Sequence, residues 1–178
     1  MNDRLVLEPA NLIIEYGTRD PFQIAHLRGY AVKFLELKRQ KGYCTNILNN
    51  YFIFINEHLS RQMQRMTCAH ELGHIILQPE RLKRGNDGRF KRIAEMELFD
   101  IKDRTEYEAN LFAANLLIDT NEMMDYLRGG YDIVQAASAL DVNVNMLALK
   151  LSQMRDVDLP FQVNSRFLGR IEDRADSI

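Results

Sequence analysis

A His-Glu-x-x-His pattern lies inside an apolar stretch near the middle of the chain, at residues 67–77. Residues four apart share one face of a helix, so His70 and His74 can both direct a ring nitrogen at one metal ion. Glu71 lies about 100° further round the helix, beside the metal, where a carboxylate can accept a proton from a water at the metal. The pattern therefore predicts a metal-dependent hydrolase; the alternative is an amphipathic helix with two incidental histidines.

A catalytic zinc needs a third protein ligand, commonly a carboxylate, and keeps one position open for water. The next strongly helical segment, residues 103–118, offers Glu106, and Asn110 follows four residues later on the same face. One of these two side chains can bind the metal while the other hydrogen-bonds a ligating histidine. Two alternatives stay open from the residues alone. Glu106 also suits the capping-box position after Asp103, and Glu108, about 200° away, is a second candidate ligand.

Composition indicates an ordinary globular protein, with 46% hydrophobic and 27% charged residues among 178. We expect a metallopeptidase core over residues 1–128 and a helical extension over residues 129–178 that packs on it. The net charge of −2 gives no electrostatic reason to expect direct nucleic-acid binding. No apolar run approaches the roughly 20 residues of a membrane span, and we see no secretion signal. Cys44 and Cys68 are interpreted as buried, reduced thiols, which predicts a cytoplasmic protein.

Strand formers dominate three short segments in the first half of the chain, at residues 31–37, 43–47 and 51–55. The connections between them are short, and Asn49-Asn50 supplies the second turn. Sequential strands with short connections are typical of an antiparallel meander. We therefore expect an α+β fold in which a small three-stranded antiparallel sheet packs on the metal-binding helix.

Helix signals surround this sheet. Asp20-Pro21 begins a short helix that Gly29 ends, and Ser60 is the expected N-cap of the metal-binding helix. The first half of the charged segment that follows, residues 80–102, is interpreted as an exposed loop, and residues 93–99 are a candidate short helix that partly covers the site.

The last part of the chain is predicted to be mostly helical. A helix up to Arg128 is followed by two short helices at residues 132–140 and 144–154, with the outline of a helix-turn-helix. The second of these offers only Lys150 for contacting bases and is otherwise mostly apolar. We interpret the pair as a packing hairpin, followed by a surface tail from residue 155.

The two motif segments together resemble the ImmA/IrrE family of metallo-endopeptidases. Residues 64–77 match its A-H-E-L-G-H helix, and residues 106–117 match its later E-x-x-A-N-x-F-A-x-x-L-L helix. The resemblance is good over residues 21–117 and looser up to residue 154. One departure is visible at residues 118–119, where the family usually continues Met-Pro and this chain has Ile-Asp.

The resemblance implies a zincin-like minimal metallopeptidase with one Zn²⁺ per chain. It matches His70 and His74 to the zinc-binding histidines and Glu71 to the catalytic glutamate. Glu106 matches the carboxylate ligand of the second helix, and Asn110 matches the position beside the metal histidines. The arrangement is similar to that of thermolysin-like zincins, in which a glutamate on a later helix is also the third ligand.

Three side chains are candidates to stabilise the oxyanion beside the zinc, namely Tyr43, Tyr107 and His58, and the sequence does not choose among them. The resemblance implies a protein substrate, a partner helix-turn-helix repressor whose cleavage releases phage or mobile-element genes. We expect the substrate to lie as an extended peptide along the sheet edge. The alternatives are a regulator that binds and sequesters a repressor without cutting it, and a metal-stabilised subunit of a larger assembly.

Overall fold

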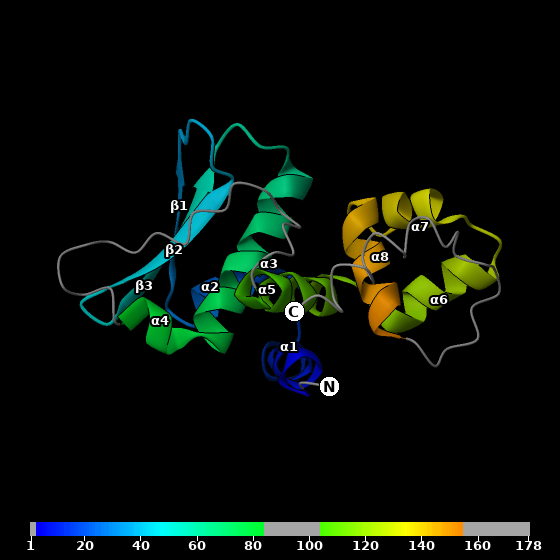
Figure 1. The fold of residues 1–178 in the computed structure, drawn as a ribbon, viewed down its shortest axis with the longest axis horizontal. Helices are drawn as coiled ribbons and strands as arrows, with labels where there is room; N and C mark the ends of the chain where they lie inside the picture. Colours follow the sequence, from blue (N-terminus) through cyan, green and yellow to red (C-terminus); the bar gives the residue numbers. More distant parts are fainter. Residues whose placement is uncertain (1–2, 84–103, 155–178) are drawn as a thin grey trace.

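The computed structural model describes residues 3–83 and 104–154. The sheet lies at one end of the molecule and α6 to α8 lie at the other, with α3 and α5 between them (Figure 1). The predicted α+β class is confirmed, while the expected helix at residues 93–99 and the tail from residue 155 lie outside the described residues. In chain order the elements are α1 (Arg4–Tyr16), α2 (Pro21–Leu27), β1 (Ala31–Leu35), β2 (Gly42–Ile47), β3 (Asn50–Asn56), α3 (Arg61–Leu77), α4 (Pro79–Lys83), α5 (Arg104–Leu117), α6 (Thr120–Arg128), α7 (Ile133–Ala139) and α8 (Val144–Gln153).

The sheet is mixed, and the predicted antiparallel meander is wrong. Its strand order is β1-β3-β2, with β3 antiparallel to β2 and parallel to β1. The connection between β1 and β2 therefore crosses the end of the central strand, a span of about 10 Å, instead of turning back beside β1. The side-chain amide of Asn56, the last residue of β3, holds this connection by donating to the carbonyls of Leu37 at 2.7 Å and Gln40 at 3.1 Å.

The β2–β3 hairpin turns one residue earlier than predicted. Leu48 and Asn49 occupy its tip with φ of 51° and 63°, and Asn50 already pairs with Ile47 as the first residue of β3. Two successive left-handed residues are the geometry that matches the twist of a two-residue hairpin. The Asn46 side chain supports the turn by accepting a hydrogen bond from the Asn49 N–H at 3.2 Å.

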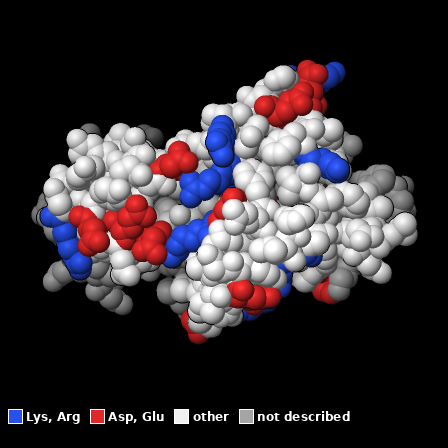
Figure 2. Space-filling view, turned by 180° about the vertical axis from the view of Figure 1, so that it is seen from behind, with Lys and Arg blue, Asp and Glu red and all other residues white. Residues whose placement is uncertain are grey.

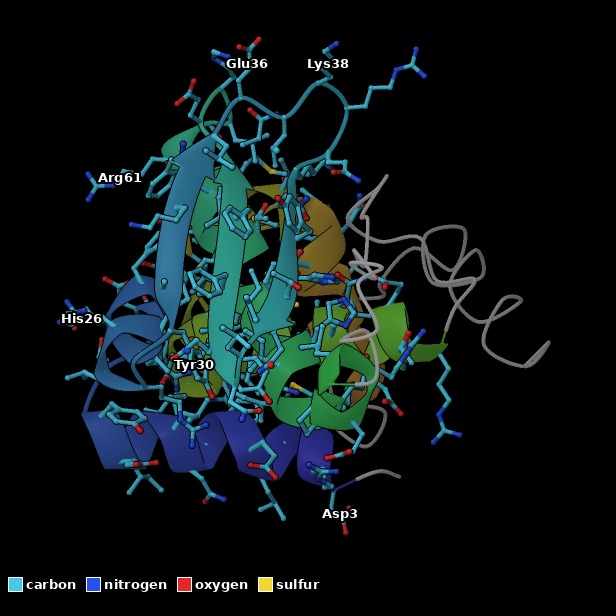
Figure 3. The ribbon with its side chains drawn as sticks, turned by 90° about the vertical axis from the view of Figure 1, so that its left-hand side faces the viewer. Asp3, His26, Tyr30, Glu36, Lys38 and Arg61 are labelled. Atoms are coloured by element: carbon cyan, nitrogen blue, oxygen red, sulfur yellow. The ribbon has the colours of Figure 1, made fainter. Side chains whose placement is uncertain are left out.

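The predicted boundaries of α2 and α3 are confirmed by their caps. The Asp20 carboxylate accepts from the Phe22 N–H at 2.9 Å, and Pro21 begins the helix. The Ser60 hydroxyl accepts from the Met63 N–H at 3.2 Å at the start of α3. In Figure 3 the three strands stand side by side above α1.

Helix α1 was not predicted, and it contains a proline at its sixth position, Pro9. Because proline has no N–H, the carbonyl of Leu5, four residues earlier, loses its partner within the helix. Asn115 of α5 replaces that partner by donating from its side-chain amide to the Leu5 carbonyl at 3.0 Å. The helix is therefore stabilised by its packing on α5, with the side chains of Leu5, Pro9 and Leu12 buried.

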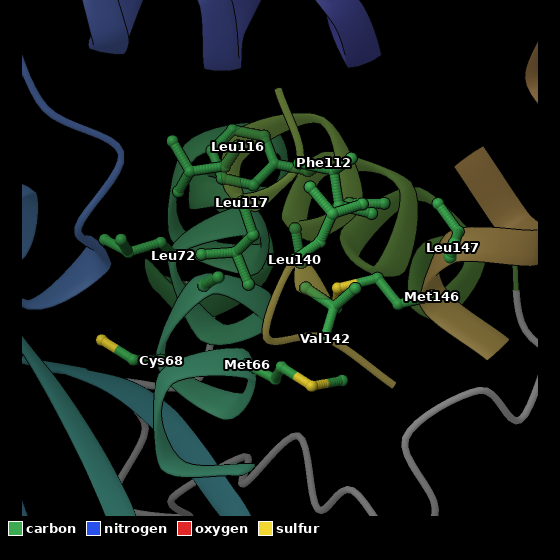
Figure 4. Close-up of a cluster of buried hydrophobic side chains, with 14 of the residues drawn as sticks. Met66, Cys68, Leu72, Phe112, Leu116, Leu117, Leu140, Val142, Met146 and Leu147 are labelled. Carbon is green, nitrogen blue, oxygen red and sulfur yellow. The ribbon is translucent and has the colours of Figure 1, made fainter. Parts of the chain in front are cut away.

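One apolar core connects the sheet end of the molecule with the C-terminal helices (Figure 4). Because these helices share buried side chains with α3 and α5, they complete the packing around the metal-binding helix. The boundary between residues 128 and 129 stays a prediction. Fully buried members of this core include Met66 and Leu72 of α3, Phe112 and Leu116 of α5, and Met146 and Leu147 of α8.

Two basic side chains hold the C-terminal end of α5. Arg19 donates to the Leu116 carbonyl at 3.1 Å and pairs with Asp119 at 2.6 Å. Lys150, which is only 4% exposed, donates to the Ile118 carbonyl at 2.8 Å. Cations at this end complement the helix dipole. The ammonium of Lys150 is thus bound at the end of α5 and is buried, so it is not at the surface where it could contact a nucleic-acid base.

Lys150 gives the chain a distinctive dependence of stability on pH. Burial and the nearby Arg19 lower the pKa of Lys150 from 10.5 to about 8, which Asp119 offsets in part. The Lys150 side chain therefore binds its proton more tightly in the unfolded chain than in the folded one. Lys150 destabilises the folded state at neutral pH, and this destabilisation decreases as the pH rises above 8. We expect the free energy of unfolding to rise by roughly 2 kcal/mol relative to Lys150→Met between pH 7 and 9.5. Urea denaturation of both proteins measures this difference, and parallel pH profiles would contradict it.

Candidate metal centre

Three side chains from two helices converge on one point. His70 and His74 lie one turn apart on α3, both fully buried, with their Nε2 atoms 2.9 Å from each other. A carboxylate oxygen of Glu106, near the start of α5, lies 3.3 Å from His70 Nε2 and 3.4 Å from His74 Nε2. Among the described residues these form the one group of three potential metal ligands, with all donor atoms within 4.8 Å of one another.

The outer nitrogens of both histidines are fixed by amide side chains. His70 Nδ1 lies 2.8 Å from Asn110 Oδ1, and His74 Nδ1 lies 3.1 Å from Gln78 Oε1. Because an amide oxygen can only accept, each Nδ1 carries the proton and each Nε2 presents a lone pair to the shared point. Two lone pairs and a carboxylate oxygen that face one another repel unless a cation lies between them, so the donor set fits a metal ion.

The spacing also suits zinc. Zinc–nitrogen and zinc–oxygen bonds of about 2.0–2.2 Å in a tetrahedral site place neighbouring donors roughly 3.3–3.5 Å apart. The two separations from Glu106 to the histidines match this, and the one between the histidines is shorter. A set of two imidazoles and one carboxylate is the ligand type of catalytic zinc sites that keep a fourth position open.

The charge state of Glu106 supports its role in this group. Burial alone would raise the pKa of Glu106, but when the two Nε2 atoms are protonated, their hydrogen bonds and charge lower it well below its usual range. A cation in place of those protons favours the ionised carboxylate for the same reason. The side chain is therefore an ionised carboxylate at neutral pH, as a metal ligand must be. Its expected capping partner, Asp103, lies outside the described residues. The competing candidate, Glu108, pairs instead with Arg104 on its own helix at 3.0 Å.

Glu71 is fully buried on α3 and lies against β2. The Cys44 thiol, also buried, lies close enough to this carboxylate for the charge of Glu71 to affect the pKa of the thiol. Burial raises the pKa of Cys44 well above its usual value, and the charges of Glu71 and Glu106 raise it further, so the thiol stays protonated. Gly42, two residues earlier on the same strand face, allows this close approach of β2 to α3, since a Cβ there would collide with the Thr67 side chain and lie 2.8 Å from the Phe54 carbonyl oxygen.

A close helix crossing sets the position of Glu106 relative to α3. A Cβ added at Gly73 would lie 3.1 Å from both the Cα and the carbonyl oxygen of Ala109, and 3.2 Å from the Phe112 ring. Glycine at this position therefore allows α5 to approach α3 closely enough for Glu106 to reach the histidines. The element that crowds Gly73 is thus α5 and not the sheet, because this face of α3 turns towards the other helix.

The three candidate oxyanion stabilisers lie in different surroundings. Tyr43 follows Gly42 on β2, and its ring stacks on Phe54 with centroids 4.8 Å apart. Tyr107 of α5 packs against a small apolar cluster that includes Leu5. His58 is exposed between β3 and α3. These contacts do not choose among the three, and the role stays a prediction for each.

Comparison with known proteins agrees with this geometry. A family model described as the IrrE N-terminal-like domain matches residues 28–152. Metallopeptidase ImmA of Bacillus subtilis (strain 168) is 30% identical to this chain over 153 residues, which cover 81% of the chain and 82% of the relative. The chain belongs to the ImmA/IrrE family. It is a metallopeptidase of that family, with His70, His74 and Glu106 as its metal-binding group. No helix in the described part of this family member is long and apolar enough to cross a membrane.

The roles of two residues in the metallopeptidase site were not predicted from the sequence. Gln78 lies four residues after His74, on the same helix face, so spacing alone could have indicated it. It also donates to the Thr105 carbonyl at 3.1 Å, which connects the end of α3 to the residue just before Glu106. Cys44 could not be paired with Glu71 from sequence, because the contact depends on which strand lies against α3.

Gln78 is expected to orient a metal ligand, and replacing it with the similarly sized Met removes both of its hydrogen bonds. We expect Gln78→Met to weaken zinc binding by about 10- to 100-fold, as the loss of a hydrogen-bonding partner of a metal histidine typically does. Gln64→Met is the matched control, since Gln64 lies on the same helix and its side chain bonds only the Glu57 carbonyl among the described residues. Competition with a fluorescent zinc chelator measures both affinities. Equal affinities in the two variants would remove Gln78 from the site.

Proposed function

We propose that this metallopeptidase is a zinc-dependent endopeptidase that cleaves a partner helix-turn-helix repressor, with Glu71 as its general base. One observation carries the proposal. Three metal-binding atoms converge on one point, and the helix that carries both histidines also carries the buried carboxylate of Glu71. A protein that only binds a repressor needs the metal group at most for stability, and it has no use for a carboxylate held at that position.

Zinc held by His70, His74 and Glu106 would supply Lewis acidity, which lowers the pKa of water to about 7 and polarises a peptide carbonyl. Glu71 accepts the proton of the attacking water and then transfers it to the leaving amine. The buried thiol of Cys44, which stays protonated, lies near the Glu71 carboxylate and does not compete with it for the proton. Asn110 and Gln78 hold the two imidazoles in the tautomer that leaves Nε2 free for the metal.

The substrate is proposed to lie along β2. This strand is at the edge of the sheet, so its outer backbone groups can pair with an extended peptide. Gly42 and Cys44 bring the same strand against the general base. A peptide added there would pass the metal group in extended form, which favours an exposed loop of a repressor over its folded core.

The repressor as substrate is supported by the resemblance of the two motif helices to family proteases that act on such proteins. A repressor is an intracellular target, and we accordingly propose a cytoplasmic site of action. The alternative function, sequestration without cleavage, predicts the same partner with no new chain termini.

Mapping of new N-termini in cells distinguishes the two functions. Cells that express the wild-type chain are compared with cells that express Glu71→Gln, and free amino termini are labelled and identified by mass spectrometry. We expect a repressor-derived terminus only with the wild-type chain. A repressor that co-purifies equally with both proteins and remains uncut would establish sequestration instead.

A further inference from the structure

A second site lies on the side of α3 away from the metal group. It is a cavity of about 400 Å³ bordered by the start of α2, the first turns of α3 and the turn between α7 and α8. Figure 2, which shows the molecule from behind, has basic side chains, with acidic ones beside them, around a hollow near the middle of this face. Three arginines line the cavity, Arg19, Arg61 and Arg65, together with the ring of Phe22 and the carboxylates of Asp20 and Asp141. The Asp20 carboxylate already caps α2 by accepting from the Phe22 N–H.

Arg61 occupies a position where a cation weakens the helix. It is the first residue of α3, and no acidic side chain lies in the first turn. The positive end of the helix dipole repels a guanidinium there, and Arg65, four residues on, adds like-charge repulsion. Arg61 is exposed, and no hydrogen bond or ion pair holds it among the described residues. A locally unfavourable charge without a compensating contact indicates a function outside the fold.

The other two arginines, Arg19 and Arg65, are held by ion pairs, and their guanidinium groups have further N–H donors besides those in the pairs. Arg65 uses one nitrogen to reach Asp141, at 3.1 Å, and a guanidinium carries five N–H donors. Asp141 holds this place with a left-handed φ of 51°, a conformation that few non-glycine residues adopt. Arg19 is fixed by Asp119 at 2.6 Å. Arg19 and Arg65 are therefore held in place around the cavity, and Arg61 adds a positive charge that forms no ion pair among the described residues.

The cavity is separate from the metal group. Arg61 precedes His70 by nine residues, which places it about 180° round α3 and roughly 13 Å along the axis. In Figure 3 Arg61 projects outward from the side of the molecule. A ligand in this cavity does not meet the catalytic residues, but a protein substrate is large enough to contact both places at once.

We propose that this cavity binds an acidic segment of the protein substrate, with a carboxylate on Arg61 and Arg65 and an apolar neighbour against Phe22. The chemistry is that of arginine with a carboxylate, in which two parallel hydrogen bonds add to the charge attraction. The inference rests on the proposed protein substrate, and it assigns a substrate class: repressors that carry exposed glutamates or aspartates away from the cleaved loop.

Fluorescence anisotropy tests this with a rhodamine-labelled peptide of four glutamates around a central leucine. The full-length Glu71→Gln chain is titrated so that the peptide stays intact, and a peptide with glutamines in place of the glutamates is the probe control. We expect Arg61→Glu to weaken binding by about tenfold or more, the loss of one charge-assisted contact, while Arg61→Lys retains most of it. Arg128→Glu, at an exposed position of α6, is expected to bind like the unaltered chain.

Arg61→Glu should fold as well as the unaltered chain, because a glutamate at the start of α3 favours the helix. We expect the melting temperature of this variant to be equal or higher. Binding that is absent from all proteins, or equal in Arg61→Glu and Arg128→Glu, overturns the proposal. If inorganic phosphate binds in the cavity and the peptide does not, the proposal is also overturned, and the cavity is assigned to a phosphate-bearing ligand. Zinc content and peptide hydrolysis do not enter these measurements, so their failure would contradict the proposed function separately.

Discussion

Replacing Glu106 with alanine is expected to weaken zinc binding by more than about a hundredfold. The loss of a residue that merely orients a metal histidine costs 10- to 100-fold, and the loss of a direct charged ligand should exceed that. The carboxylate of Glu106 lies 3.3 Å and 3.4 Å from the two histidine nitrogens, and a cation bound between them favours its ionised form. Removing it leaves two buried imidazoles, an incomplete set for a catalytic zinc.

Glu108→Ala is the matched control for this substitution. Glu108 lies two residues further along α5, and its carboxylate pairs with Arg104 at 3.0 Å. That contact is an ion pair between neighbours on one helix, worth only about 0.2–0.5 kcal/mol. Zinc affinity of Glu108→Ala should therefore equal that of the wild type in a chelator competition. If Glu108→Ala lost the metal and Glu106→Ala kept it, the third ligand would be Glu108 and not Glu106.

Glu71→Gln is expected to reduce peptide hydrolysis by about 10²- to 10⁴-fold, the usual contribution of a general base, while zinc stays bound. Glutamine has the same shape as glutamate and fits the same fully buried place beside Cys44. It cannot accept a proton at neutral pH, so the substitution removes the base without opening a cavity. The measurement is the single-turnover cleavage rate of a fluorogenic protein substrate under saturating enzyme.

Two checks accompany that rate. Zinc content and the melting temperature of Glu71→Gln should match those of the wild type, because the residue binds no metal in the proposed site. A variant that still cleaves at the wild-type rate would move the general base to another residue. Loss of zinc along with activity would instead place Glu71 among the ligands.

The sequence predicted the parts of this molecule that local rules determine. The four-residue spacing of His70 and His74 on one helix, and the caps at Asp20 and Ser60, depend on neighbours within a few positions. Glu106 was separable from Glu108 only weakly by helix geometry, and the family resemblance favoured it. The structure agrees by placing Glu106 at the histidines.

Features set by contacts between distant segments were not predictable in the same way. The strand order depends on whether residues 36–41 turn beside β1 or cross the central strand, and the segment's composition is compatible with both. Helix α1 contains Pro9, which argues locally against a helix, and the compensating partner, Asn115, lies 110 residues from the carbonyl it satisfies. The crowding of Gly73 by Ala109 likewise depends on the α3–α5 crossing.

The most direct test of the account is the metal content of the wild-type chain, purified without chelators and measured by elemental mass spectrometry. The convergence of His70, His74 and Glu106 predicts about one zinc per chain. A chain that holds no metal, even after zinc is supplied and the excess is removed, would contradict the proposed zinc peptidase and leave sequestration of a repressor as the better explanation.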